Sequence, residues 1–232
     1  MNISSNYITT VNHNIYTANG VSNAFRNSAV RTAERLKAFS PKAKAAADKL
    51  ENIIILSDAN STMPEEFKKT ETKFHKYAED AYGFVSKADN AIVLVEKNHG
   101  RKNAALEGTI AEQAEDTFTH ETGHLIDDEY STTDAFKQAY LRDLKNIDGL
   151  LDDPNSKICG EDTLEMVNYL HHYMEGVNFQ DGIDESDITR EGLRENFAEC
   201  FSTLADSHPT KINEIYAALF PNTMKTTLEF VI

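Results

Sequence analysis

Two histidines and a glutamate in the middle of the chain have the spacing of a metal site. Residues 120–124 read His-Glu-Thr-Gly-His and match the pattern H-E-x-x-H. If this segment is helical, His120 and His124 lie on one face and can bind one ion through neutral imidazole nitrogens, which zinc prefers. Glu121 can reach a water on that ion and is the candidate general base. The alternative interpretation is a pair of surface histidines on an ordinary helix.

A third ligand is predicted from a second pair of residues. Glu195 and Glu199 are also spaced as i and i+4, on an expected helix with an apolar stripe. A carboxylate from a second helix completes a His2Glu site and leaves the fourth position open for water. A carboxylate one turn later can accept a hydrogen bond from a ligand imidazole and fix its tautomer. We therefore expect Glu195 to be a ligand and Glu199 to be the imidazole's partner; the alternative is two solvent-facing glutamates.

Other residues fit a metal site less well. Tyr130 stands where the pattern H-E-x-x-H-x-x-G-x-x-H has its third histidine, so that pattern is absent. His171 and His172 are adjacent, so on a helix they point to different sides. Three further histidines are isolated in the sequence and carry no argument for a metal role: His75, His99 and His208.

Hydrophobic periodicity and helix-breaking residues divide the chain into the elements that would position these side chains. Helices are expected at residues 24–39, 41–50, 61–81, 109–127, 131–145, 162–174, 189–205 and 211–219, with a last one opening at Pro221. Strands are expected at 52–56 and 90–96, and loops at 152–161 and 176–187. The two histidines thus fall on one expected helix and the two glutamates on another.

Composition limits the partners and the location of the protein. The chain has 23 basic and 38 acidic residues, a net charge of −15. Nucleic acid is therefore an unfavourable partner, because phosphate binding needs a basic surface. No apolar run is long enough for membrane insertion, and the N-terminus lacks the apolar core of a secretory signal peptide. The two cysteines, Cys159 and Cys200, do not indicate a disulfide framework, and the oligomeric state is not predicted.

The N-terminal segment differs from the rest of the chain. Residues 1–23 are rich in Asn, Ser and Thr, and no charged residue precedes Arg26. We expect this segment to be poorly ordered on its own. It is either an export address for a specialised bacterial secretion system or simply a flexible terminus, in which case the protein would be cytoplasmic.

The motifs resemble those of a known peptidase family. His120-Glu-Thr-Gly-His-Leu-Ile-Asp-Asp128 is similar to the H-E-x-G-H-x-x-D-D stretch of the anthrax lethal factor catalytic domain and its relatives, including the clostridial Pro-Pro endopeptidases. Glu195-Asn-Phe-Ala-Glu-Cys-Phe201 resembles the family's E-x-F-A-E-x-F. Phe220-Pro-Asn-Thr-Met-Lys-Thr226, followed by Phe230-Val-Ile232, is similar to its closing A-P-x-T-x-x-F-I segment. The similarity covers about residues 107–232.

The resemblance implies a gluzincin, a zinc endopeptidase with one Zn²⁺ per chain. The ligands would be His120, His124 and Glu195, with Glu121 as the base and Glu199 beside the ligands. The implied fold is α+β: a mostly helical, zincin-like catalytic domain over residues 24–232, with a small β-sheet packed on the active-site helix.

The chain departs from the family pattern in two places. The gap between the histidine motif and Glu195 is longer than in lethal factor, so the loops at 152–161 and 176–188 are candidate insertions. The family also has a catalytic tyrosine shortly before the glutamate ligand, but residues 184–190 contain none. The nearest candidates for stabilising the oxyanion are Tyr169, His172 and Tyr173.

The expected substrate is a protein or peptide, and a host-cell protein if the chain is an injected bacterial effector. The strand at 90–96 is either a sheet edge to which an extended peptide adds, or an internal strand, since its apolar run fits burial on both faces. Two other functions use the same ligands. One is zinc hydrolysis of a non-peptide bond, and the other is a binding protein with a structural zinc site, although such a site needs no base and usually has four protein ligands.

Overall fold

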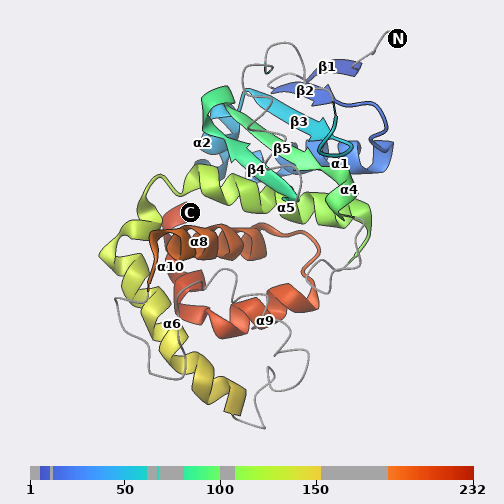
Figure 1. Ribbon diagram of the computed structural model, residues 1–232. Coiled ribbons are helices and arrows are strands. Elements are labelled where there is room, and N and C mark those ends of the chain that lie inside the picture. Colours follow the sequence, from blue (N-terminus) through green and yellow to red (C-terminus); the bar gives the residue numbers. More distant parts are fainter. Residues whose placement is uncertain (1–5, 11–12, 62–66, 68–80, 100–107, 153–187) are drawn as a thin grey trace. The chain divides into compact units, whose positions relative to one another are not determined.

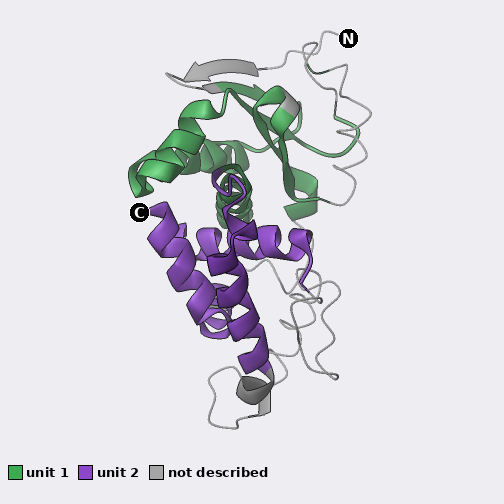
Figure 2. Cartoon of the chain, turned by 90° about the vertical axis from the view of Figure 1, so that its left-hand side faces the viewer, with its two compact units in different colours: residues 1–125 green, residues 126–232 purple. Residues whose placement is uncertain are grey.

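A computed structural model describes residues 6–10, 13–61, 67, 81–99, 108–152 and 188–232 (Figure 1). Several expectations lie outside these residues: most of the helix at 61–81, the helix at 162–174, nearly all of the two loops, and Tyr169, His172 and Tyr173. The chain divides into two compact units, residues 1–125 and 126–232, which are coloured separately in Figure 2. The expectation that residues 24–232 behave as one domain stays a prediction.

Unit 1 contains the sheet and the helix that carries the two histidines. Its elements are β1 (Asn6–Thr10), β2 (His13–Thr17), α1 (Asn23–Phe39), α2 (Pro41–Lys49), β3 (Asn52–Leu56), β4 (Gly83–Ser86), η2 (Lys87–Asp89), β5 (Ala91–Val95), α4 (Glu96–His99) and α5 (Ile110–Ile126). The side chain of Ser40 accepts a hydrogen bond from the backbone N–H of Ala43 at 3.1 Å, and Pro41 takes the first position of α2. An N-cap serine followed by proline is a typical helix start, and it confirms the predicted beginning of the helix at 41–50.

The strands of the described residues form one mixed sheet in the order β1-β2-β3-β5-β4. β2, β3 and β5 run parallel, whereas β1 and β4 pair antiparallel with β2 and β5. Every residue of β3 and β5 is buried, as expected for central strands with apolar runs. Of the two alternatives for the strand at 90–96, the internal one is therefore confirmed and the sheet-edge one is wrong. β4 is the strand at that end of the sheet.

Three strands were not predicted. β1 and β2 lie within residues 1–23, where polar composition led us to expect poor order, and β4 is four residues long. Short polar strands give a weak pattern, and β2 owes its place to parallel pairing with β3, which buries Ile15 and Tyr16. Tertiary pairing therefore determines these strands more than local sequence does.

Strand β4 and the short helix α4, which follows β5, each make a close contact with α5. A Cβ on Gly83 of β4 would lie 2.7 Å from Cγ2 of Thr117, so only glycine allows this strand to pass so near the helix. The segment after β5, predicted to be a strand end, forms the short helix α4 instead. From α4, Nε2 of the buried His99 lies 3.0 Å from Oγ1 of Thr117. The predicted α+β class, mostly helical with a small sheet on the helix of the histidine motif, is confirmed.

Unit 2 is helical throughout its described residues. After α5 come η3 (Tyr130–Thr132), α6 (Asp134–Asp152), α8 (Arg190–Ala205), α9 (Lys211–Leu219) and α10 (Pro221–Val231). α6 is longer than the predicted helix at 131–145. An aromatic cluster joins η3, α6, α8 and α10: Tyr130 stacks on Phe230 with ring centroids 3.7 Å apart, and Phe136 and Phe197 pack edge-on or tilted around them. Such contacts add stability beyond the buried area.

A buried carboxylate fixes the start of α10. Asp143 of α6 accepts hydrogen bonds from the backbone N–H groups of Asn222 and Thr223 at 3.1 and 2.7 Å. It also accepts from their side chains, at 2.6 Å each. Because the first N–H groups of a helix lack partners within it and favour negative charge, Asp143 caps α10 from another helix. Asn222 and Thr223 therefore serve as the donors that attach the start of α10 to α6.

Candidate metal centre

The histidine motif lies on α5, as predicted. The helix begins with a capping box: Oε2 of Glu112 accepts from the N–H of Thr109 at 2.7 Å, and Oγ1 of Thr109 accepts from the N–H of Glu112 at 3.3 Å. The rings of His120 and His124 are half-buried on one face, with centroids 4.9 Å apart. The i, i+4 spacing therefore places the two histidines on one face of the helix, as predicted.

The glutamate motif lies on α8. Oγ1 of Thr189 caps this helix by accepting a hydrogen bond from the N–H of Gly192 at 3.0 Å, which confirms the predicted start. Glu195 is half-buried, whereas Glu199, one turn later, is buried. Phe197 and Phe201 on the apolar face of α8 are fully buried, so packing of these rings fixes the rotation of the helix about its axis.

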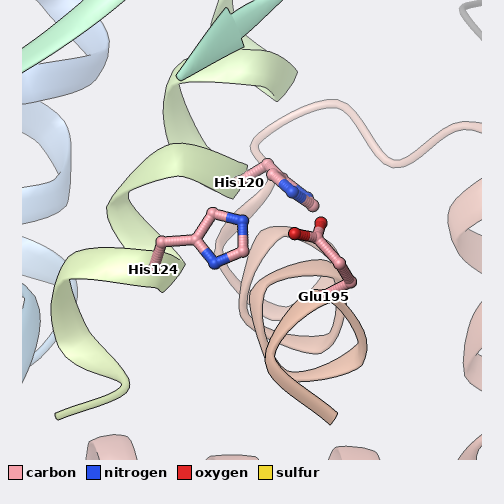
Figure 3. Close-up of side chains that lie close together, drawn as sticks. All are labelled: His120, His124 and Glu195. Carbon is pink, nitrogen blue, oxygen red and sulfur yellow. The ribbon is translucent and has the colours of Figure 1, made fainter. Parts of the chain in front are cut away.

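His120, His124 and Glu195 each offer one ligand atom, and these atoms lie within 4.8 Å of one another (Figure 3). Two imidazole nitrogens and a carboxylate oxygen are the donor set of a catalytic zinc site. Donors on one tetrahedral zinc lie roughly 3.5 Å apart, given bond lengths near 2.1 Å, so small side-chain rotations can bring this group onto an ion. The residues thus fit a metal ion, as the sequence predicted.

The two remaining predicted residues of the site are buried on the same helices. Glu121 is 7% exposed and Glu199 is 8% exposed. Glu199 lies near two other ionisable groups: burial raises the pKa of Tyr216 well above its usual value, and the charges of Cys200 and Glu199 raise it further. The charge of Glu199 on α8, one turn from Glu195, therefore acts on the buried Tyr216 of α9.

A buried histidine that sequence analysis did not assign supports α5. Nδ1 of His99 lies 2.9 Å from the carbonyl oxygen of Val95, which can only accept, so Nδ1 carries the proton and Nε2 accepts from the hydroxyl of Thr117. Its ring packs edge-on against Phe25 and Tyr82. Burial lowers the pKa of His99 to about 4, so the ring is neutral at neutral pH. An isolated histidine gives no sequence pattern from which this role could be predicted.

No protein-family model matches the chain, and no curated protein matches it significantly. Within the described part of the chain, no helix is both long and apolar enough to cross a membrane.

Proposed function

We propose that the protein is a zinc-dependent endopeptidase. The observation that carries the proposal is the grouping of His120, His124 and Glu195, because this donor set leaves a coordination position for water and substrate. The resemblance of both motifs to the anthrax lethal factor family supports peptide bonds as the target. A buried glutamate, Glu121, directly follows the first ligand, as hydrolysis requires and as a purely structural metal site does not.

Each residue of the site has one task in this reaction. When bound at these residues, a zinc ion would supply a Lewis acid for the scissile carbonyl and would lower the pKa of a coordinated water. Glu121 accepts the proton of the attacking water and donates it to the leaving amine. His120, His124 and Glu195 hold the ion, and Glu199 accepts a hydrogen bond from a ligand imidazole, which fixes its tautomer. Because Glu121 is buried, bulk water has little access to the carboxylate that transfers the proton.

The substrate is proposed to be an extended segment of a protein. A peptide that adds to a sheet edge gains backbone hydrogen bonds without side-chain specificity. Since β5 is internal, the strand that could receive such a peptide is β4, which lies at the end of the sheet and packs on α5 through Gly83. By the same resemblance, we propose that the protein is a bacterial effector exported by a specialised system and acting on a host-cell protein.

Proteomic identification of new N-termini tests this function. Candidate host-cell lysates are treated with the zinc-loaded wild-type chain, with Glu121→Gln, and with Glu191→Gln as a control at an exposed glutamate of α8. We expect new termini with the wild type and the control, and a loss of roughly 10²–10⁴-fold with Glu121→Gln, which keeps zinc but lacks the base. Equal cleavage by Glu121→Gln would remove Glu121 from the mechanism. Zinc binding with no cleavage of any protein, but turnover of small amides or esters, would favour a non-peptide hydrolase.

A further inference from the structure

The turn after α5 is held by the side chain of Asp127. Asp127 is buried, and Ser131 donates to it twice: from its N–H to Oδ1 at 2.7 Å, and from its hydroxyl to Oδ2 at 2.8 Å. The next two residues, Asp128 and Glu129, have φ values of 37° and 69°. Left-handed backbone at two consecutive non-glycine residues is unfavourable, so the surrounding contacts must maintain this turn.

One face of α8 contacts this turn at three successive positions. The contacts are spaced as i, i+4 and i+7: Arg190 with Glu129 at 2.5 Å, Arg194 with Asp127 at 3.6 Å, and Phe197 with Tyr130 at 5.9 Å between ring centroids. Residues at this spacing share a side of a helix. The turn and α8 are therefore fixed against each other in both rotation and translation.

The two ion pairs differ in their surroundings. The side chains of Arg190 and Glu129 are 64% and 68% exposed, so solvent screens their attraction and the pair contributes little. The side chain of Asp127 is 4% exposed and that of Arg194 is 30% exposed. Without Arg194, the carboxylate of Asp127 would be buried with only the two bonds from Ser131, which is costly. The pair of Arg194 and Asp127, here called the inner pair, is thus the one that constrains the position of α8 against the turn.

We propose that Asp127 and Arg194 are positioning residues for the metal ligands, an inference that rests on the proposed zinc function. Asp127 stands directly after the helix that carries His124, and Arg194 immediately precedes Glu195. The ion pair joins the backbone segments that carry two of the three ligands. Donors held in place before the ion arrives need less ordering when it binds, so the pair increases metal affinity without touching the metal.

The test compares the same substitution at two arginines one helical turn apart. Arg194→Met removes the inner pair, Arg190→Met removes the exposed pair, Arg194→Lys keeps the charge, and Asp127→Asn keeps an acceptor for Ser131. Zinc affinity is measured by competition with a chromogenic chelator. The visible absorption of the cobalt-substituted protein reports ligand geometry, and urea unfolding in EDTA reports the stability of the metal-free chain.

We expect Arg194→Met and Asp127→Asn to weaken zinc binding about 10-fold or more and to change the cobalt spectrum, since supporting groups around metal sites have effects of this size. Arg194→Lys should recover part of the affinity, and Arg190→Met should stay within about twofold of the wild type.

If Arg194→Met does not fold, Arg194→Lys and Asp127→Asn still allow the same comparison. Wild-type zinc affinity and an unchanged cobalt spectrum in the folded inner-pair variants would overturn the inference alone. Equal losses at Arg190 and Arg194 would also overturn it, whereas a wild-type chain that binds no zinc would overturn the proposed function itself.

Discussion

At the residue scale, Glu195 and Glu199 differ in what surrounds their carboxylates. Glu195 is half-buried and belongs to the group with the two histidines, whereas Glu199 is buried beside Tyr216 and Cys200. The grouping with the two histidines favours Glu195 as the candidate ligand, and the role of Glu199 as the partner of a ligand imidazole stays a prediction.

Substitution of each glutamate tests this assignment. Glu195→Ala removes one of three proposed ligands and should abolish stoichiometric zinc binding, as should His120→Ala or His124→Ala. Glu199→Ala should retain zinc but bind it about 10–100-fold more weakly, because it removes only a partner of a ligand. Zinc content after dialysis and a chelator competition measure both effects. An empty site in Glu199→Ala together with a full site in Glu195→Ala would place the ligand one helical turn later.

A second residue-scale prediction concerns acid stability. His99 has a pKa near 6.5 in the unfolded chain, and burial lowers it to about 4 in the folded protein. The fold therefore favours the neutral ring: this contribution is fully present above about pH 6.5 and is lost as the pH falls toward 4. The linked loss is up to about 3 kcal/mol of unfolding free energy, since one pKa unit corresponds to about 1.4 kcal/mol.

Urea unfolding of the metal-free protein between pH 7 and 4.5 measures this effect. His99→Gln can keep one donor and one acceptor but does not titrate, so its stability should fall less steeply with pH than that of the wild type. His208→Gln, at an exposed histidine, should behave as the wild type does. Parallel pH profiles for the wild type and His99→Gln would contradict the assignment of His99 as a buried neutral residue.

The candidate metal-binding residues were the most predictable part of the site. The grouping of His120, His124 and Glu195 could be predicted because a helix brings residues i and i+4 together and because two such pairs supply the donors that zinc prefers. The pairing of Arg194 with Asp127 could not, since both lie among many charged residues and the sequence does not show which of them meet. The oxyanion candidates stay predictions, because they lie outside the described residues.

At the scale of elements, the helices followed from local signals and most strands did not. The helices expected at 41–50 and 189–205 begin where predicted, and the structure shows Ser40 and Thr189 as their N-caps. β3 and β5 were predictable from their apolar runs. β2 and β4 depend on pairing with these central strands, which is a long-range effect that a short sequence window does not contain.

The cap between α6 and α10 gives a prediction at this scale. Asp143→Ala leaves the first N–H groups of α10 and the hydroxyl of Thr223 without their buried acceptor. The unfolding free energy should fall by about 3 kcal/mol, as expected when a buried charged acceptor is removed. The control Asp134→Ala, at the exposed first residue of α6, should cost no more than about 1 kcal/mol. Chemical unfolding of both variants makes the comparison, and similar losses would show that the cap is unimportant.

At the scale of the whole molecule, metal removal should lower thermal stability. A ligand that binds only the folded chain stabilises it by about 4 kcal/mol at a free concentration 1,000 times its dissociation constant. For a chain of 232 residues this corresponds to a melting temperature higher by roughly 10 °C. Chelation of the wild type should therefore lower the midpoint in a calorimetric scan by about that amount. His120→Ala should melt at the same temperature with and without chelator, and a similar shift in this variant would indicate a different metal site.

Chemical labelling of the buried thiol of Cys200 can report the opening of unit 2. Cys200 is fully buried and unbridged, and burial raises the pKa of its thiol well above the usual value. Alkylating reagents react with thiolates, so labelling must wait for unit 2 to open and expose this side chain. In a Cys159→Ser background, the labelling rate of Cys200 therefore measures how often unit 2 opens. The factor by which zinc slows this labelling would measure how much the metal stabilises α8, and the measurement needs no substrate.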